Sequence, residues 1–255
     1  MISLCNHWEF TPKWFDDFAA GEGTAESVRL PHTVKEIPQH YADHRSYQMV
    51  CGYRRKLELG KELEGKRLFL QFDGAAHIAT VYLNGKELAH HRTGYTAFRV
   101  EITEAAVLGG ENLLSVKLDT TENPEVPPFG FVIDYLTCGG LYREVWLDIR
   151  EKTYIEDLQI TTPDLTTLKI RPTLVNGKNC LVLVELLKGE HQLVRKAFTA
   201  DGVITISCPG VKPWEPDHPV LYTCRVSLVK IGQVLDVQEV RLASAPPSLR
   251  PTASI

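Results

Sequence analysis

Three groups of residues in this chain of 255 could do chemistry by their type and spacing. They are the basic run His90-His91-Arg92 and the carboxylate pairs Glu156-Asp157 and Asp16-Asp17. A metal site needs a third ligand beside two histidines, and adjacent strand residues point to opposite faces, so we interpret the run as a solvated loop or strand edge. Hydrolysis by paired carboxylates needs two of them about 5 to 9 Å apart across one bond, and the sequence places no such pair.

The common motifs of nucleophilic, metal and phosphate chemistry do not occur in the sequence. We find no G-x-S-x-G elbow, H-E-x-x-H helix, Walker loop or G-x-G-x-x-G turn. We therefore assign no catalytic residue, no metal ligand and no cofactor to the chain. The six cysteines are dispersed without a C-x-x-C pair, which predicts free, mostly buried thiols.

Charge and hydropathy narrow the classes of partner. The formal net charge is -4, and lysines and arginines are scattered along the chain. The sequence has no cluster of basic residues that would attract a nucleic acid or an anionic membrane, so we expect no partner of either kind. The first residues do not resemble a signal peptide, and no run approaches the ~20 apolar residues of a membrane span, which favours a cytoplasmic location.

Short strands are the elements that must position any site in the first 150 residues. Apolar runs of strand length, punctuated by turn residues, occupy 52–59, 66–72, 77–84, 98–102, 112–118 and 141–149. The dipeptide Asn84-Gly85 between two such runs is typical of a type I′ hairpin. Because many short antiparallel strands bury one face each, this region is predicted to be a β-sandwich with jelly-roll topology.

A second set of strands follows residue 150. These runs occupy 154–161, 167–174, 180–188, 202–207 and 221–229, a spacing that suits an immunoglobulin-like sandwich. We therefore predict an all-β chain with a jelly-roll domain over 1–150 and an immunoglobulin-like domain over 151–242. Residues 243–255 are rich in Ala, Pro and Ser and are predicted to form a disordered tail.

Several motifs of the chain occur in a characteristic order. They are Gly52-Tyr53-Arg54-Arg55, Leu70-Gln71-Phe72-Asp73-Gly74, Val81-Tyr82-Leu83-Asn84-Gly85, Gly94-Tyr95-Thr96-Ala97-Phe98, Gly139-Gly140-Leu141-Tyr142-Arg143-Glu144-Val145 and Trp214-Glu215-Pro216-Asp217-His218-Pro219-Val220-Leu221-Tyr222. In this order they resemble the first two domains of glycoside hydrolase family 2, the β-galactosidases and β-glucuronidases. The resemblance implies a galactose-binding-domain-like jelly roll followed by an immunoglobulin-like domain.

Most of these motif residues have a structural interpretation. Gly139 and Gly140 would allow a close approach of two backbone segments, and Arg143 would pair with a carboxylate at a domain edge. Trp214 and Tyr222 are predicted to pack in the core of the second sandwich rather than to serve as sugar platforms.

Asp134 is the residue for which the resemblance implies contact with a sugar. In the family, an aspartate six positions before the glycine of the Gly-Leu/Ile-x-Arg motif reaches from the first domain into the active site of a barrel. Counted from Gly140, that aspartate is Asp134, which is flanked by aromatic residues including Tyr135. A turn or capping role is the alternative for Asp134. Asp43 and His44 could approach the same pocket.

The resemblance also implies what the chain lacks. In the family both catalytic glutamates of the retaining mechanism lie on the barrel, so we expect a non-catalytic fragment of an enzyme that hydrolyses β-galactosides or β-glucuronides. It would scaffold a sugar pocket, bind such sugars weakly and show no glycosidase activity alone. Two alternatives remain open, namely a free-standing carbohydrate-binding module and an interaction subunit for a separately encoded catalytic barrel. Self-association into a homo-oligomer is a further expectation for exposed barrel-facing surfaces.

The amino-acid sequence after about Val240 departs from the family pattern. Relatives show Phe-Gly-Phe-Arg near this point, whereas the chain continues with Arg241-Leu242-Ala243-Ser244-Ala245. If these five residues were encoded CGT TTG GCT TCC GC, a frame starting at the third base of the arginine codon would encode Phe-Gly-Phe-Arg. We therefore hypothesise out-of-frame text after a disrupted gene, a sequencing error or an engineered truncation, which the nucleotide sequence would decide.

Overall fold

The computed structural model describes residues 1–36, 43–127, 139–200 and 202–244, and it places them in two compact units, Met1–Arg150 and Glu151–Ile255. Asp134 and Tyr135 therefore lie outside the described residues. Strands form both units, and the predicted all-β fold is confirmed. No helix within the described ranges is long and apolar enough to cross a membrane.

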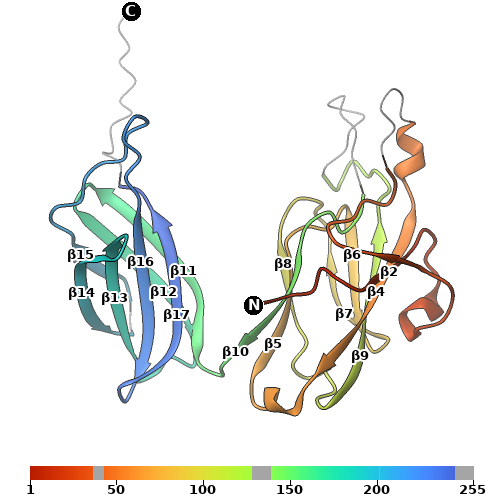
Figure 1. The fold of residues 1–255 in the computed structure, drawn as a ribbon, viewed down its shortest axis with the longest axis horizontal. Helices are drawn as coiled ribbons and strands as arrows, with labels where there is room; N and C mark the ends of the chain where they lie inside the picture. The colour runs from red at the N-terminus through yellow and green to blue at the C-terminus, as the bar shows by residue number, and fades with distance from the viewer. Residues whose placement is uncertain (37–42, 128–138, 201, 245–255) are drawn as a thin grey trace, which may run out of the picture. The chain divides into compact units, whose positions relative to one another are not determined.

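The first unit is a sandwich of two antiparallel sheets (Figure 1). The larger sheet has the order β3-β2-β4-β9-β6-β7 and the smaller one the order β1-β10-β5-β8. Their strands are β1 (Ile2–Ser3), β2 (Trp8–Thr11), β3 (Glu26–Val28), β4 (Val50–Leu59), β5 (Arg67–Phe72), β6 (Ile78–Leu83), β7 (Lys86–His91), β8 (Phe98–Glu101), β9 (Gly110–Asp119) and β10 (Val145–Arg150), with the short 3-10 helices η1 (Asp16–Ala20), η2 (His44–Tyr47) and η3 (Lys61–Leu63).

Alternation along the strands builds the core of the first unit. On β4 the side chains of Cys51, Tyr53, Leu57 and Leu59 are buried between the sheets, as are Leu68, Leu70 and Phe72 on β5. Burying each such side chain contributes roughly 1.5 to 3 kcal/mol. The hairpin between β6 and β7 has the predicted stereochemistry, because Asn84 and Gly85 have φ angles of 53° and 77°.

The second unit also consists of two antiparallel sheets. They have the orders β11-β12-β15 and β14-β13-β16-β17. The strands are β11 (Tyr154–Asp164), β12 (Thr167–Val175), β13 (Leu181–Lys188), β14 (His191–Thr199), β15 (Ile204–Ser207), β16 (Tyr222–Lys230) and β17 (Gln233–Leu242). The carboxylate of Asp236 on β17 accepts from the N–H of Ile155 at 2.9 Å, and the amide of Gln238 donates to the C=O of Ile155 at 2.6 Å. These two side chains therefore join β17 to β11 of the other sheet.

The structure differs from the sequence prediction in several elements. The strand expected over 141–149 begins only at Val145, because the C=O of Leu141 accepts a hydrogen bond from His32 instead of joining the sheet. Strands β14 and β17 were not predicted; each is an outer strand of its sheet, where exposed side chains weaken the alternation.

Three predictions about single residues or segments have clear outcomes. Tyr222 lies in the core at 2% exposure, but the prediction for Trp214 is wrong, since its side chain is 39% exposed. Ala243 and Ser244, which we expected in the tail, belong to the described structure, and Ser244 is buried. The five described cysteines are free and buried, as predicted, at positions 5, 51, 180, 208 and 224.

Candidate functional site

One end of the first unit gathers the chain segments that flank residues 37–42 and 128–138 (Figure 1). We call this end the rim and define it by Val34, Tyr47, Thr120, Pro127 and Gly139. The N–H of Val34 donates to the C=O of Gly139 at 3.0 Å, which ties the segment before residue 37 to the segment after residue 138. The described segments before residue 37 and after residue 138 therefore lie side by side, although they are distant in the sequence.

Thr120 joins the remaining rim segments. It lies just after β9 at 1% exposure, and its hydroxyl donates to the C=O of Tyr47 at 2.6 Å and accepts from the N–H of Met49 at 2.9 Å. A Cβ at Gly139 would lie 2.4 Å from Thr120, so only glycine fits beside it. Buried backbone groups need such partners, and Thr120 therefore fixes η2, the start of β4 and Gly139 together.

His77 lies next to Thr120 and is 1% exposed. Its Nδ1 is 3.0 Å from the C=O of Thr120, and because a carbonyl only accepts, Nδ1 carries the proton. Nε2 is then an acceptor, and it has no hydrogen-bond partner within the described part of the chain. Burial lowers the pKa of His77, and the Thr120 carbonyl and nearby carboxylates offset part of this lowering.

A second polar pair, His32 and Tyr53, lies close to the rim. His32 Nδ1 is 2.8 Å from the hydroxyl of Tyr53, and the ring of Tyr53 is fully buried. Burial raises the pKa of Tyr53, so its phenol stays protonated, and the tautomer of His32 sets which of the two groups donates. Gly140 passes over this pair with φ of 136°, and a Cβ there would lie 2.3 Å from the C=O of His32. The predicted close approach at Gly139-Gly140 is confirmed.

The structure describes only some of the four residues predicted to bind sugar. Asp134 and Tyr135 lie outside the described residues, between rim residues Pro127 and Gly139. Asp43 is exposed, and its carboxylate accepts from the N–H of Arg45 at 3.0 Å, which caps η2. His44 is the first residue of η2, and its side chain is not described. Sequence reasoning did not single out Thr120 or His77, because nothing local distinguishes them from other strand-end residues.

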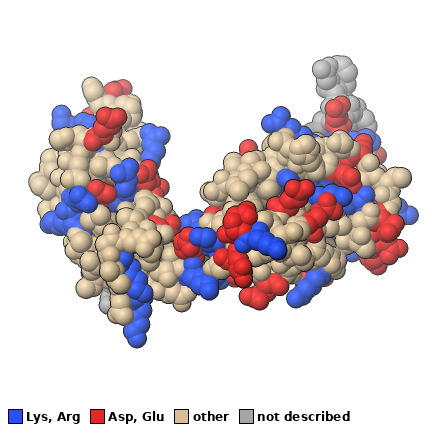
Figure 2. Space-filling view, turned by 60° about the horizontal axis from the view of Figure 1, so that its bottom comes forward, with Lys and Arg blue, Asp and Glu red and all other residues tan. Residues whose placement is uncertain are grey.

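Two hollows lie outside the rim, one in each unit. A groove of about 660 Å³ in the first unit is lined by Arg54, Arg55, Lys56, Glu9, Glu111, His7, Ala20, Gly21 and Leu113. Its charges are already engaged, with Arg54 bound to Glu9 at 2.6 Å and Lys56 to Glu111 at 3.0 Å. Basic and acidic side chains are also interspersed on the face shown in Figure 2. The third basic side chain, Arg55, has no carboxylate partner among the lining residues, but it donates to the backbone carbonyls of Leu4 and Lys56, so each charged side chain of the groove already has a partner.

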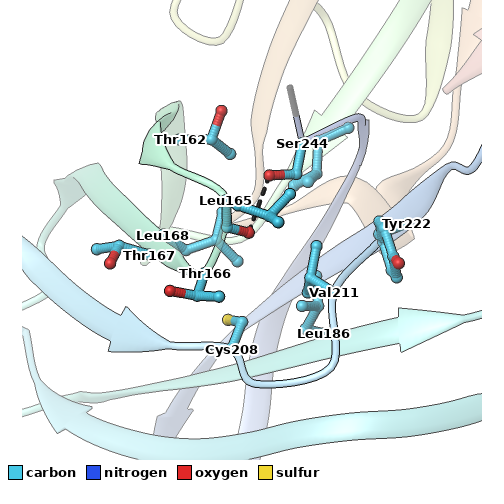
Figure 3. A pocket seen from close by; sticks show the side chains of 11 residues that line it. Thr162, Leu165, Thr166, Thr167, Leu168, Leu186, Cys208, Val211, Tyr222 and Ser244 are labelled. Atoms are coloured by element: carbon cyan, nitrogen blue, oxygen red, sulfur yellow. Dashed lines mark hydrogen bonds between the residues drawn. The ribbon is translucent and has the colours of Figure 1, made fainter. Parts of the chain in front are cut away.

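The other hollow lies in the second unit, where Ser244 Oγ donates to the C=O of Leu165 at 3.0 Å (Figure 3). The cavity measures about 10 Å³ and is lined mainly by apolar atoms of residues that include Leu186, Cys208 and Tyr222. That volume corresponds to one water molecule at most, so it cannot hold a sugar.

No group of three or more His, Cys, Asp or Glu side chains in the described ranges could hold a metal ion. His90 and His91 belong to β7, the outer strand of its sheet, as the edge interpretation predicted. The His91 ring stacks on Phe98 with centroids 4.2 Å apart, and its Nε2 binds Thr93 and Thr96.

The fold and the rim define a class of protein. The described residues form a jelly-roll sandwich followed by an immunoglobulin-like sandwich, which defines an all-β chain of two successive sandwich domains. Each unit matches one family model, described as "Glycosyl hydrolase 2 galactose-binding domain-like" over residues 38–126 and "Glycosyl hydrolases family 2" over 153–243. The chain belongs to glycoside hydrolase family 2.

Curated relatives agree with this membership. The β-galactosidase of Thermoanaerobacter pseudethanolicus is 33% identical over 248 residues, which cover 90% of this chain and 33% of that protein. The β-galactosidase of Rhizobium meliloti is 35% identical, over 91% of this chain and 32% of the relative. The chain thus spans about a third of the length of the curated relatives it matches.

Solved structures show the same fold. A β-glucuronidase of Bifidobacterium dentium, complexed with coumarin-3-O-glucuronide, superposes with a TM-score of 0.79 at 22% identity, over 95% of this chain and 48% of that chain. A β-glucuronidase of Bacteroides uniformis gives 0.78 at 24% identity, over 95% and 32%. At these identities the likeness establishes the fold alone.

Proposed function

We propose that this chain is the non-catalytic N-terminal portion of a retaining β-glycosidase, in which the rim forms one side of a pocket for β-galactosides or β-glucuronides. The rim carries the proposal, because the hydrogen bond between Val34 and Gly139 brings the segments that flank Asp134 and Asp43 to one end of the sandwich. The names of the relatives supply the two candidate sugars.

The proposed division of labour follows from the chemistry of the reaction. A retaining glycosidase needs an acid/base and a nucleophile whose carboxyl groups lie about 5 to 5.5 Å apart across the bond. In our proposal both belong to a barrel domain outside this chain. Asp134 contributes binding, since a carboxylate accepts two hydrogen bonds from neighbouring sugar hydroxyls. A pocket with only one side binds sugars weakly, so we expect millimolar affinity at best for the chain alone.

The test supplies the missing part in trans. The purified chain is mixed with the portion of the Thermoanaerobacter pseudethanolicus β-galactosidase that lies outside its matched third, and hydrolysis of chromogenic β-galactoside and β-glucuronide is measured. We expect activity only in the mixture, and a loss of at least about tenfold with Asp134→Ala, as for a lost charged hydrogen bond. Asp217→Ala, at an exposed turn of the second unit, is the matched control. Turnover by the chain alone, or full activity with Asp134→Ala, would refute the proposal.

A free-standing sugar-binding module makes a different prediction for the same material. Calorimetric titration of the chain alone with galactose and with glucuronate would then give saturable binding that Asp134→Ala removes. A flat titration combined with activity in the mixture supports the accessory role instead.

A further inference from the structure

Three motifs that lie far apart in the sequence meet on one surface of the first unit. The hydroxyl of Tyr142 donates to the C=O of Gly94 at 2.7 Å, and Arg143 Nη1 lies 3.3 Å from the C=O of Asp73 and 3.5 Å from that of Tyr95. The contacts join segments 48 and 70 residues apart. Within the described chain the partners of Arg143 are carbonyl oxygens, so its pairing with a carboxylate at a domain edge stays a prediction.

The backbone at Asp73-Gly74 is shaped to receive these side chains. A Cβ at Gly74 would lie 2.8 Å from the Tyr142 hydroxyl and 3.0 Å from Cδ of Arg143, so glycine leaves the space that they fill. The carboxylate of Asp73 accepts from Trp146 Nε1 at 2.8 Å. We call Asp73, Tyr95, Tyr142, Arg143 and Trp146 the motif patch.

The motif patch has the composition of a protein interface. Tyr95 is 51% exposed, its ring meets that of Tyr142 edge-on with centroids 6.4 Å apart, and the exposed Arg143 guanidinium lies 5.2 Å from the Tyr142 ring. Tyr, Trp and Arg are the residues most often found at the energetic centres of interfaces. Ring packing and the carbonyl contacts hold these side chains in place, which lowers the entropy lost on binding.

Arg143 indicates the chemistry of the partner. A guanidinium has five N–H donors, and the described contacts of Arg143 use only Nη1. A planar fork of this kind suits a carboxylate bound by two parallel hydrogen bonds. Since no carboxylate of the described chain pairs with Arg143, the partner would supply one.

The motif patch lies beside the rim. The N–H of Gly94, whose C=O holds Tyr142, donates to the C=O of rim residue Pro127 at 3.2 Å. Whatever completes the pocket at the rim must therefore also come close to Tyr95 and Arg143. The relatives carry about two thirds of their length outside the matched segment, which is ample for such a partner.

We infer that the motif patch is the surface by which this chain docks onto a carboxylate-bearing face of the catalytic domain. This inference rests on the proposed function, because it names the partner of the same site. Docking through Arg143 and Tyr95 would fix the rim against the pocket with no help from the sugar.

Binding is measured separately from activity to test this inference. The chain is immobilised, and the same catalytic portion of the Thermoanaerobacter pseudethanolicus enzyme is the analyte in biolayer interferometry. We expect Arg143→Glu and Tyr95→Ala each to weaken binding at least about thirtyfold, as for interface centres, and Arg143→Lys to be intermediate. Arg195→Glu is the matched control, since this 59% exposed arginine lies in the second unit, and it should bind within about twofold of the unmodified chain.

The outcomes separate the two proposals. Activity in the mixture with unchanged binding by folded Arg143→Glu and Tyr95→Ala overturns the docking surface and leaves the proposed function standing. Normal binding of Asp134→Ala with full activity overturns the sugar role and leaves the docking surface standing. The docking surface is also overturned if the unmodified chain does not bind the catalytic portion. The same holds if sedimentation shows a dimer of the chain that Arg143→Glu dissociates while the catalytic portion does not bind, because the motif patch then serves contacts between copies of the chain.

Discussion

His77 donates its Nδ1 proton to the carbonyl oxygen of Thr120 across 3.0 Å, and both residues are 1% exposed. This contact fixes the tautomer of the imidazole and joins the start of β6 to the end of β9 at the rim. Thr120 in turn holds Tyr47 and Met49 through its hydroxyl. The geometry of the rim thus depends on a buried polar connection between elements that are distant in the sequence.

The first prediction concerns pH. Burial lowers the folded-state pKa of His77, His32 and His91 below the ordinary value of 6.5. As pH falls below 6.5, the histidines of the unfolded chain therefore bind more protons than those of the folded chain. The stability that the neutral histidines contribute above pH 6.5 is lost progressively as pH falls toward their lower folded-state pKa values. We expect the free energy of unfolding, measured in urea, to be smaller at pH 5.5 than at 7.5.

His77→Asn is the matched variant for this pH dependence. Asn does not titrate, and its amide can still donate to the Thr120 carbonyl. The dependence on pH should therefore be shallower in His77→Asn than in the unmodified chain. An unchanged slope, or an NMR titration that places the pKa of His77 above 6.5, would contradict the assignment.

The second prediction tests Thr120 as the connection between rim segments. Thr120→Val keeps the side-chain shape but removes the hydroxyl that serves Tyr47 and Met49. Because two buried backbone groups lose a partner, we expect a loss of about 1 to 3 kcal/mol in the free energy of unfolding, measured by urea titration. The neighbouring exposed Thr121→Val should change it by less than about 0.5 kcal/mol. Equal effects at the two positions would show that the Thr120 hydroxyl holds nothing together.

The third prediction concerns the close approach at Gly140. Gly140→Ala adds a Cβ that meets the His32 carbonyl at 2.3 Å, at a φ of 136° that side chains rarely adopt. We expect a loss of at least about 2 kcal/mol, again by urea titration. Gly85→Ala is the control, since Gly85 also has positive φ but has nothing within 4 Å of the added Cβ. It should cost less than Gly140→Ala, and the difference measures the contact with His32.

The sequence by itself determined the elements whose signals are local. Alternation of apolar residues predicted β4, β5, β6 and β9 close to their observed bounds, because burial of every second side chain follows from strand geometry alone. Asn84-Gly85 predicted its hairpin because both residues tolerate positive φ. The order of the motifs implied the two-domain fold and the family, which the comparisons confirm.

Only the tertiary structure decided which side chains meet. The sequence predicted a core position for Trp214, which is exposed, and it did not indicate that Arg143 binds the carbonyl oxygens of Asp73 and Tyr95. It did not single out Thr120 or His77. These outcomes depend on contacts between residues dozens of positions apart, such as Arg143 with Asp73, and no local preference encodes which distant backbone group lies within 3.5 Å of a side chain. Packing of the two sheets and of the rim segments settles that choice.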